Sequence, residues 1–544
     1  MPSMFKDTKY SLRLLLVLVV GFGLRVAGLL WGLPNSAHLS YSYHPDEVFL
    51  VSWAHALANG EIITKQFAYG GTLYLSVLNA YRLIAQAFAG HLGGINVLAD
   101  TLIVGRICNV LISVLTLAIT AASARRLFGD RAALASAAVL ALCPAHAFLA
   151  QNVRPDELST LLVAVAIYLS CRRLTQPGER TSFFPELISG FTIGAMIALR
   201  FPLGIFGFVP LTVIWLRIRP AAWRDALAMV RPAAALGLVA VLGYIVCSPH
   251  SLMYPQALRM GLQVQWQYQS SVFVDAVGRG PGFYQYGVSM LAEAMGWPLY
   301  ALAVAGVLRA LWRRRSEDLL LLSAVLPYLL MTSNTSWVVV RYTLPLLPGL
   351  ALLIGSLLPA ESKTGSRIPA VWPAVLMAAL AFTLLPDLAL RRAISLPNSR
   401  DRVGAWVEQH VPAGTDVVVF QQYDSDVFFL PTLPRTVHER VFPLQGNVDP
   451  VVLAQASPAP LLLLGEDAYA SMDRLGANHP KPRIAELSSL LTTPGRFRIA
   501  RRFDPDISIF GLDFSSWFRS QDYQIIQPGF RLYERADAPS RILP

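Results

Sequence analysis

Residues Leu14 to Leu33 read LLLVLVVGFGLRVAGLLWGL, and this stretch decides the fold class of the chain. A run of about 20 apolar residues is long enough to cross a lipid bilayer as a helix. The run is too long for the apolar core of a typical signal peptide, and it lacks a small-residue cleavage pattern. We therefore expect an uncleaved first membrane span, with Lys9 and Arg13 ahead of it on the cytoplasmic side.

The composition extends this interpretation to the whole chain. Of its 544 residues, 54% are hydrophobic and 15% are charged, whereas soluble proteins have about 25% charged residues. The net charge of +11 comes from short basic clusters between apolar runs, as in cytoplasmic loops, so we expect no nucleic-acid partner. The four cysteines lie inside or at the ends of apolar runs without metal-ligand spacing. The sequence thus predicts a mainly α, polytopic membrane protein surrounded by the lipid bilayer.

Further apolar runs follow the first one. Their approximate bounds are 101–124, 132–150, 158–174, 187–199, 201–216, 232–248, 288–311, 318–333, 342–359 and 368–386. All basic connections face the cytoplasm only if 187–199 and 201–216 cross separately and the segment 71–89 lies at the outer surface as an amphipathic helix. This parity argument predicts a helical bundle of about 11 spans.

The chain changes character near residue 390, where polar residues become more frequent. Val403 to His410 has the pattern of a short helix, and Asp416–Phe420 and Pro460–Leu464 have that of buried strands. We therefore predict a transmembrane module over residues 1–389, with a first exterior loop over 34–99, and a small exterior α/β domain over 390–544.

Two Pro-Asp-Glu sequences fall on the predicted exterior side. One lies in Tyr41–Val48, which reads YSYHPDEV, and the other is Pro155–Glu157. Proline followed by acidic residues is favourable at a helix start, which explains both without any function. Carboxylates gathered at one membrane face also form functional sites, so both explanations remain open. The catalytic candidates are Asp46, Glu47 and Asp156, and the accessory candidates are His44, Glu157 and Tyr342.

Several cations also lie on the predicted exterior side, against the usual distribution of basic residues. They are Arg154, Arg200, Arg341 and Lys65. Snorkelling toward lipid head groups would explain them, but a guanidinium also binds phosphate through two hydrogen bonds and stays charged. For Arg106, inside the second run, we expect a structural pairing with an acid or a helix end.

A carboxylate base beside phosphate-binding cations suits transfer of a group from a lipid-linked phosphate. A divalent ion held by Asp46 and Glu47 could assist, since hard cations favour oxygen ligands. No further ligand cluster is visible in the sequence, and we expect no other cofactor.

A series of motifs follows in order along the chain. They are His44-Pro-Asp-Glu47, Arg106, Arg126-Leu-Phe-Gly129, Arg154-Pro-Asp-Glu157, Arg341-Tyr-Thr-Leu-Pro-Leu-Leu-Pro348 and Trp406-Val-Glu-Gln-His-Val-Pro412. This series resembles the GT-C class of integral-membrane glycosyltransferases, specifically bacterial relatives of the dolichyl-phosphate-mannose protein mannosyltransferases and aminoarabinose transferases. One departure is Tyr69-Gly-Gly-Thr72, which replaces a tandem-proline and lysine element of the protein mannosyltransferases. It leaves the acceptor and the role of Lys65 open.

The resemblance implies an inverting glycosyltransferase with Asp46 as catalytic base and a polyprenyl-phosphate monosaccharide as donor. It places the site on the outer face of a bacterial-type cytoplasmic membrane and leaves open a protein, lipid or glycan acceptor. One rival is a transporter or flippase of a lipid-linked intermediate, which would favour inverted repeats and ionisable residues deep within spans. Another is a non-catalytic assembly protein that binds a partner through the exterior domain.

Overall fold

A computed structural model describes residues 8–36, 38–176, 184–219, 223–270, 281–335, 338–358, 371–421, 430–444, 459–479, 482–537 and 542. The chain forms two compact units. The first contains Met1–Leu29, Asp46–Ser271 and Pro281–Asp387, and the second contains Leu30–Pro45, Val272–Gly280 and Leu388–Pro544. The predicted domain bounds, 1–389 and 390–544, stay a prediction.

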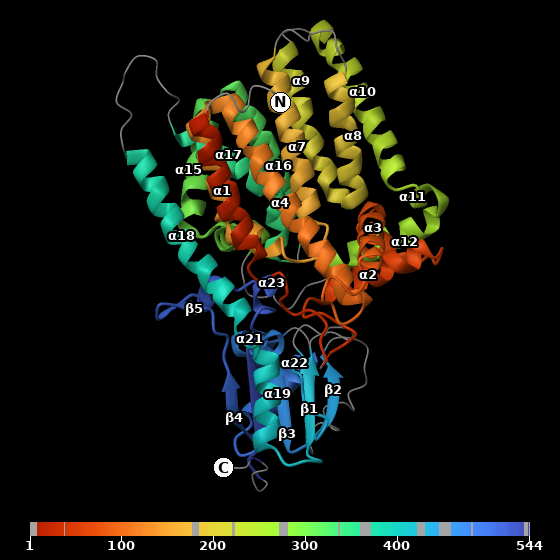
Figure 1. Cartoon of the computed structure of the whole chain (residues 1–544), viewed down its shortest axis with the longest axis vertical. Helices are drawn as coiled ribbons and strands as arrows, with labels where there is room; N and C mark the ends of the chain where they lie inside the picture. The colour runs from red at the N-terminus through yellow and green to blue at the C-terminus, as the bar shows by residue number, and fades with distance from the viewer. Residues whose placement is uncertain are drawn as a thin grey trace. The chain divides into compact units, whose positions relative to one another are not determined.

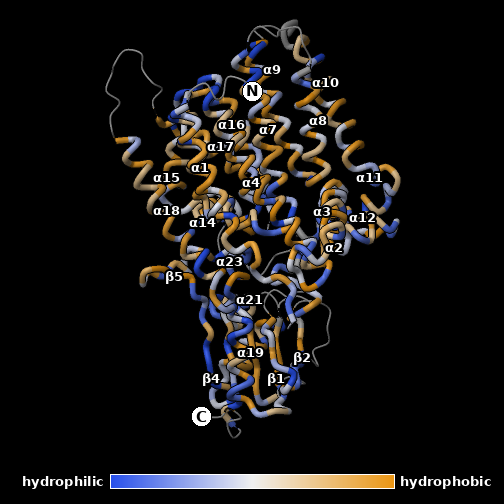
Figure 2. The backbone as a smooth tube through the Cα atoms, in the orientation of Figure 1, coloured by the Kyte–Doolittle hydropathy of each residue, from blue (hydrophilic) through white to orange (hydrophobic). Residues whose placement is uncertain are grey.

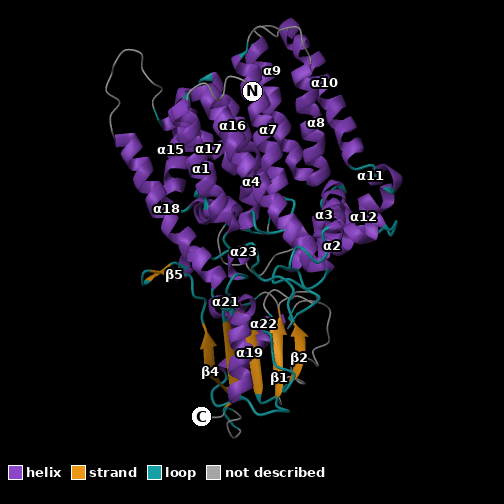
Figure 3. Ribbon diagram, in the orientation of Figure 1, coloured by secondary structure: helices purple, strands orange, loops and turns teal. Residues whose placement is uncertain are grey.

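The first unit consists of helices (Figures 1 and 3). Its longer helices are α1 (Thr8–Val26), α4 (Val97–Phe128), α5 (Asp130–Ala141), α7 (Asp156–Thr175), α8 (Phe184–Leu199), α9 (Phe208–Ile218), α10 (Trp223–Cys247), α15 (Trp297–Arg313), α16 (Ser316–Thr332), α17 (Leu347–Leu357) and α18 (Val371–Ser395). Short helices α6 (Pro144–Leu149), α13 (Gly282–Tyr284) and α14 (Leu291–Met295), with the π turn η4 (Gln285–Met290), connect them.

Several of these helices have the length and hydropathy of membrane spans. Within the described ranges, 6 segments qualify, namely Val97–Phe128, Asp156–Thr175, Phe201–Ile218, Leu227–Cys247, Val340–Leu357 and Val371–Ser395. Figure 2 shows hydrophobic residues along most of the bundle. The mainly α membrane fold is confirmed. The count of about 11 spans stays a prediction, and positions 359 and 368–370 of the predicted runs lie outside the described residues.

Glycines bring α8 and α10 into close contact. A Cβ atom at Gly190 would lie 2.6 Å from the carbonyl oxygen of Leu236, and one at Gly194 would overlap the carbonyl oxygen of Ala240. Small residues allow helix backbones to approach closely in membranes, where van der Waals contact drives association. This contact fixes α8, whose last residue immediately precedes Arg200.

Shorter helices gather at one end of the first unit. They are α2 (Pro45–Ala58), η1 (Thr64–Phe67), α3 (Leu73–Ala87), α11 (His250–Met253) and α12 (Pro255–Ser270). Figure 1 shows α2, α3 and α12 together. In α3, Tyr74, Leu78, Tyr81 and Ala85 are buried at helical spacing while Leu83 is exposed, which is the amphipathic pattern predicted for this segment.

Two interruptions of the helical chain place arginines at helix junctions. Arg200 is extended (φ −153°, ψ 119°) between α8 and the 3₁₀ segment η2 (Phe201–Gly207). Pro202 lacks the N–H that would continue the hydrogen bonding of α8. Arg341 lies likewise in the 3₁₀ segment η5 (Val340–Leu346), which leads directly into α17.

The second unit contains a five-stranded sheet with the order β2-β1-β3-β7-β4. The strands are β1 (Asp416–Gln421), β2 (His438–Pro443), β3 (Leu461–Gly465), β4 (Phe497–Phe503) and β7 (Phe530–Arg535). β1 is parallel to β2 and β3, while β7 runs antiparallel between β3 and β4. Both predicted strands are confirmed to within about one residue at each end, well inside the usual uncertainty of element boundaries.

Helices cover both faces of this sheet. Because successive strand side chains alternate between faces, Val417 and Val419 pack with α19 (Ser399–His410), while Val418 packs with α21 (Glu466–Leu475) and α22 (Pro482–Thr492). The predicted helix Val403–His410 lies within α19. The remaining elements are the hairpin β5 (Ser508–Ile509) and β6 (Leu512–Asp513), with η6 (Gly476–Asn478), η7 (Ser515–Trp517) and α23 (Gln521–Gln524).

Candidate active site

Four charged side chains of the first unit form a continuous series of ion pairs. Arg154 Nη1 lies 3.1 Å from Asp46 Oδ2, and Arg154 Nε lies 3.2 Å from Asp156 Oδ2. Arg200 Nη2 lies 2.9 Å from Asp156 Oδ1. Asp46 comes from the first turn of α2, Asp156 from the first turn of α7, and the two arginines from the segments beside α7 and α8. The fold therefore brings residues about 150 positions apart in sequence into one cluster.

Burial differs along this series. The side chains of Arg154 and Asp156 are 2% and 3% exposed, and that of Arg200 is 9% exposed. The Asp46 side chain retains 26% exposure. Buried charges are tolerated when opposite charges alternate at contact distance, which offsets the cost of removing each from water. Asp46 is therefore the most accessible carboxylate of the series.

Two tyrosines flank Arg200. The centre of its guanidinium lies 5.3 Å from the ring centroid of Tyr69 and 5.3 Å from that of Tyr342. Arg341 lies 5.8 Å from the same Tyr342 ring. Burial raises the pKa of Tyr69, with a further increase from Asp46 that Arg154, Arg200 and Arg341 oppose. The two rings hold the Arg200 plane in place through cation–π contact.

Adjacent glycines allow the Tyr69 loop to approach the end of α8. Gly70 has φ +96°, and a Cβ atom there would lie 2.8 Å from Cβ of Phe201. A Cβ at Gly71 would lie 2.5 Å from the carbonyl oxygen of Ala198. The Phe201 N–H donates to the Tyr69 carbonyl at 2.9 Å. The Tyr69-Gly-Gly-Thr72 sequence thus has a structural role in seating Tyr69 beside Arg200.

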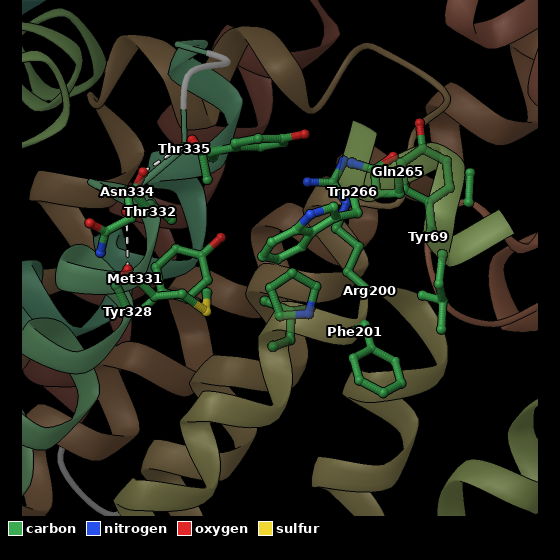
Figure 4. A pocket seen from close by; sticks show the side chains of 15 residues that line it. Tyr69, Arg200, Phe201, Gln265, Trp266, Tyr328, Met331, Thr332, Asn334 and Thr335 are labelled. Carbon is green, nitrogen blue, oxygen red and sulfur yellow. Dashed lines mark hydrogen bonds between the residues drawn. The ribbon is translucent and has the colours of Figure 1, made fainter. Parts of the chain in front are cut away.

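Arg200 faces a cavity of about 560 Å³. Apolar and aromatic side chains make up most of its lining, including Tyr69, Phe201, Leu203, Leu262, Trp266, Tyr328, Met331 and Tyr342. Figure 4 shows Tyr69 and Arg200 on one side of this space, with Tyr328 and Met331 on the other. Arg200 Nη2 pairs with Asp156 Oδ1, whereas Arg200 Nε makes no hydrogen bond to any described residue. The cavity thus combines an apolar wall with a guanidinium whose Nε–H has no acceptor among the described residues.

Glu47 lies outside this arrangement. Its carboxylate accepts hydrogen bonds from Arg106 Nε at 3.1 Å and Arg106 Nη2 at 2.7 Å, and from the Val153 N–H at 2.8 Å. Both oxygens are engaged, and the pair is fully buried. Arg106 therefore has the acidic partner expected from sequence. The pair ties α2 to α4 and to the segment before α7, so Glu47 positions its neighbour Asp46.

The other sequence candidates also lie apart from the ion-pair series. Glu157 is buried with Oε2 3.6 Å from His146 Nε2, and Arg25 Nη2 lies 2.6 Å from His146 Nδ1. Lys65 is exposed on η1, and no interaction among the described residues links it to Arg200. His44 is buried in the second unit, where its carbonyl accepts a hydrogen bond from Ser42 Oγ.

The two acids of the first motif do not fit a shared divalent cation. Glu47 gives both oxygens to Arg106 and Val153, whereas Asp46 pairs with Arg154. Among the residues that the structure describes, no group of three or more His, Cys, Asp or Glu side chains is arranged to hold a metal.

Sequence reasoning missed several residues that line the cavity. Trp266 lies in α12 and Tyr328 in α16, directly after Pro327. Tyr328 lies in an apolar run and Trp266 lies between two glutamines, and neither position carries a local sign of a site. Tyr69 was the one detectable case, because the Gly-Gly pair after it indicates close backbone approach.

Comparison with known proteins identifies the fold. Residues 92–253, which include Arg106, Arg154, Asp156 and Arg200, match the family model "Dolichyl-phosphate-mannose-protein mannosyltransferase". The structure of apo ArnT from Cupriavidus metallidurans is similar, with a TM-score of 0.50 and 14% identity over 86% of this chain and 94% of that chain. The chain has the GT-C glycosyltransferase fold.

A second GT-C structure is also similar over most of the chain. The apo Archaeoglobus fulgidus oligosaccharyltransferase gives a TM-score of 0.51 and 12% identity over 96% of this chain and 78% of that chain. The same enzyme tethered to an acceptor peptide with the NVT sequon gives 0.50, with the same identity of 12% and coverage of 96% and 78%. No curated protein sequence gave a significant match. At these identities the structural likeness establishes the fold, and the family match adds support for a membrane glycosyltransferase.

Proposed function

We propose that this protein transfers one sugar from a polyprenyl-phosphate donor to a hydroxyl acceptor with inversion at the anomeric carbon. The observation that carries the proposal is the series Asp46–Arg154–Asp156–Arg200, which ends at a largely apolar cavity of about 560 Å³. A lipid-linked phosphate needs both features together, because its isoprenoid chain requires apolar contact and its phosphate requires cations.

The donor would bind with its phosphate at Arg200 and its isoprenoid units along the cavity. Arg200 Nε would donate to the phosphate, since it makes no hydrogen bond to a described residue, while Nη2 stays paired with Asp156. Leu203, Leu262 and Met331 supply apolar contact. The matching family model bears the name of a dolichyl-phosphate-mannose enzyme, which agrees with a donor of this class. Arg341, next to Tyr342, is a second phosphate candidate.

Asp46 would act as the catalytic base. The acceptor hydroxyl gives its proton to an Asp46 oxygen as its own oxygen forms a bond to the anomeric carbon. The bond from that carbon to the phosphate oxygen breaks, and the polyprenyl phosphate leaves with the electron pair. Arg200 would stabilise the charge that develops on the leaving phosphate, and Arg154 would hold the Asp46 carboxylate in place.

The site is proposed to face the exterior of the cytoplasmic membrane. Helix α7 carries Asp156 in its first turn and Arg172 and Arg173 in its last turn. Its 20 residues rise by about 30 Å, the thickness of the bilayer core. Arg172 and Arg173 belong to one of the short basic connections assigned to the cytoplasm, so Asp156 would lie toward the opposite side.

The acceptor remains open between protein, lipid and glycan. The similar oligosaccharyltransferase holds a peptide acceptor in one of its structures. In this chain no described contact selects among these acceptor classes. The proposal therefore specifies the donor class and the reaction and leaves the sugar to experiment.

The test is transfer of label from a panel of polyprenyl-phosphate sugars. Full-length protein in proteoliposomes is mixed with membranes from cells lacking it, which serve as acceptor source. We expect Asp46→Asn to lower transfer by at least about 100-fold, the lower range for removal of a general base. The exposed Glu61→Gln on the same unit is the matched control and should keep full activity.

Two outcomes would contradict the proposal. Full transfer by a well-folded Asp46→Asn protein would remove Asp46 from the mechanism. Movement of intact labelled lipid across the bilayer, without cleavage of the sugar–phosphate bond, would favour the flippase alternative.

A further inference from the structure

The β5–β6 hairpin presents an apolar tip to the surroundings. Ser508 pairs with Asp513 and Ile509 with Leu512, so Phe510 and Gly511 form the two-residue turn. Phe510 is 84% exposed and Leu512 is 53% exposed. Among the described residues of the second unit, Phe510 is the most exposed large hydrophobic side chain. Figure 2 shows the hairpin as a hydrophobic projection beside the label β5.

The turn holds Phe510 in a conformation that this residue rarely adopts. Its φ is +50°, and that of Gly511 is +79°. Turns with both central residues at positive φ favour Asn-Gly or Asp-Gly, which are also polar. Phenylalanine at this position is disfavoured by the backbone and by exposure to water. A favourable contact at the tip would account for both.

The base of the hairpin is fixed to the end of an apolar helix. Arg392, near the C-terminal end of α18, donates to Asp506 Oδ1 at 3.0 Å, to the Ser508 carbonyl at 2.8 Å and to Ser508 Oγ at 2.9 Å. Ile507 and Phe514, at the base, are buried. The hairpin is thus a supported projection with a defined starting point.

That starting point lies at the C-terminal end of a candidate membrane span. α18 is one of the candidate spans, and its apolar sequence gives way to Arg391 and Arg392 shortly before it ends at Ser395. Arginines at the end of a span lie at the level of the lipid head groups. With α18 crossing the bilayer, the hairpin would begin at the membrane–water interface, and its tip residues Ile509 to Leu512 carry no charge.

We propose that the tip of this hairpin, Phe510 with Leu512, inserts into the head-group region of the exterior leaflet. The occupant of the apolar tip is lipid, because Arg392 fixes the hairpin at the depth where head groups begin. Aromatic and leucine side chains bind the interface by burying their apolar surface about 5–10 Å into the boundary between head groups and acyl chains. This contact would offset the cost of the unfavourable turn and give the exterior unit a second attachment to the membrane besides α18.

The experiment places an environment-sensitive fluorophore at the tip. Phe510→Cys is introduced into a full-length variant whose four native cysteines are replaced by alanine. After labelling with a nitrobenzoxadiazole group, the protein is reconstituted into vesicles of phosphatidylcholine and phosphatidylglycerol. The matched control is Ser489→Cys, an exposed position on α22 of the same unit.

We expect the label at position 510 to shift to the blue and to lose at least half its intensity with lipids that carry a shallow spin label. Aqueous iodide should quench it at least threefold less than it quenches the label at position 489. The spin-labelled lipid should not quench the label at position 489. Equal iodide quenching at both positions would overturn the proposal. Protection of position 510 from both quenchers would also overturn it, because a protein partner or second copy would then cover the tip.

A second variant keeps the proposal testable if the cysteine-free protein does not fold. Phe510→Trp needs no cysteine replacement, and the parent protein supplies the background signal of its other tryptophans. Brominated lipids should quench the additional fluorescence of this variant. Absence of any additional quenching would overturn the proposal, and transfer activity is not needed for either measurement.

Discussion

Adjacent acids have different surroundings at both Pro-Asp-Glu sequences. Asp46 and Asp156 pair with arginines of the site, whereas Glu47 pairs with Arg106 and Glu157 lies beside His146. The reason is helical geometry, since consecutive residues project about 100° apart and cannot face the same site. Sequence alone located the acidic pairs but could not determine which member of each faces Arg200.

The Glu47–Arg106 pair should affect the free energy of unfolding more than the rate of the chemical step. Both side chains are fully buried, so Glu47→Gln leaves the Arg106 charge without its counterion. Breaking a buried ion pair from one side costs about 3–5 kcal/mol. We expect a large fall in the thermal unfolding temperature of the detergent-solubilised protein.

A double-substitution cycle provides the control for this prediction. The double variant Glu47→Gln/Arg106→Gln should lose less free energy of unfolding than the sum of the two single variants. The reason is that the double variant leaves no buried charge without its partner. Strict additivity of the three unfolding measurements would contradict the direct coupling.

Arg200 is the residue whose replacement should affect donor binding most directly. Arg200→Lys keeps a positive charge near Asp156 but loses the planar group between Tyr69 and Tyr342. A hydrogen bond to a charged group contributes about 1.5–3 kcal/mol, so affinity for polyprenyl phosphate should fall by roughly 10- to 100-fold. Direct titration with polyprenyl phosphate measures this change. Arg82→Lys on α3, where Arg82 bonds Asn79, should leave affinity unchanged.

At the scale of elements, interrupted helices place the cations of the site. Arg200 and Arg341 both lie where a 3₁₀ segment leads into a span, and each segment contains a proline. The arginine between runs 187–199 and 201–216 was visible in the sequence as an interruption. What the sequence could not show is that the Tyr69 loop packs on that junction, because Gly71 meets Ala198 across more than a hundred residues.

The α8–α10 contact should control the position of Arg200. Gly194→Leu would place a side chain against the backbone of Ala240 and force the helices apart. Overpacking of this kind costs about 1–3 kcal/mol, and the displaced end of α8 should raise the donor KM more than it lowers kcat. Gly237→Leu on α10 is the control, because a Cβ there meets nothing within 4 Å. Equal changes in KM and kcat in the two variants would show that the α8–α10 contact does not set the position of Arg200.

At the scale of the whole molecule, the periodicity of the sequence predicted the secondary-structure elements better than it predicted which compact unit each segment joins. The strands of the second unit were visible because β1 and β3 are buried on both faces and therefore form continuous apolar runs. The inclusion of Leu30–Pro45 in that unit was not predictable. It depends on long-range contacts such as the hydrogen bond from Tyr43 Oη to Asp401 Oδ2 at 2.7 Å, which no local pattern encodes.

The proposed topology makes a prediction for the intact cell. Single cysteines at Glu61, Ser489 and Arg315, in a cysteine-free chain, are treated with a membrane-impermeant maleimide. Positions 61 and 489 should react from outside, whereas position 315, beside the basic end of α15, should react only after lysis. All three positions are exposed or at an element end, so access depends on the side of the membrane.

Comparing the labelling of positions 61 and 489 tests the number of spans most directly. The two lie on one side only if an even number of spans separates them. With α3 at the surface, this requires 187–199 and 201–216 to cross individually. External labelling of 489 without labelling of 61 would leave an odd number of spans between them. In that case Asp46 and Arg154, which two predicted spans separate, would both face the cytoplasm, and a donor presented on the outer leaflet could not reach them.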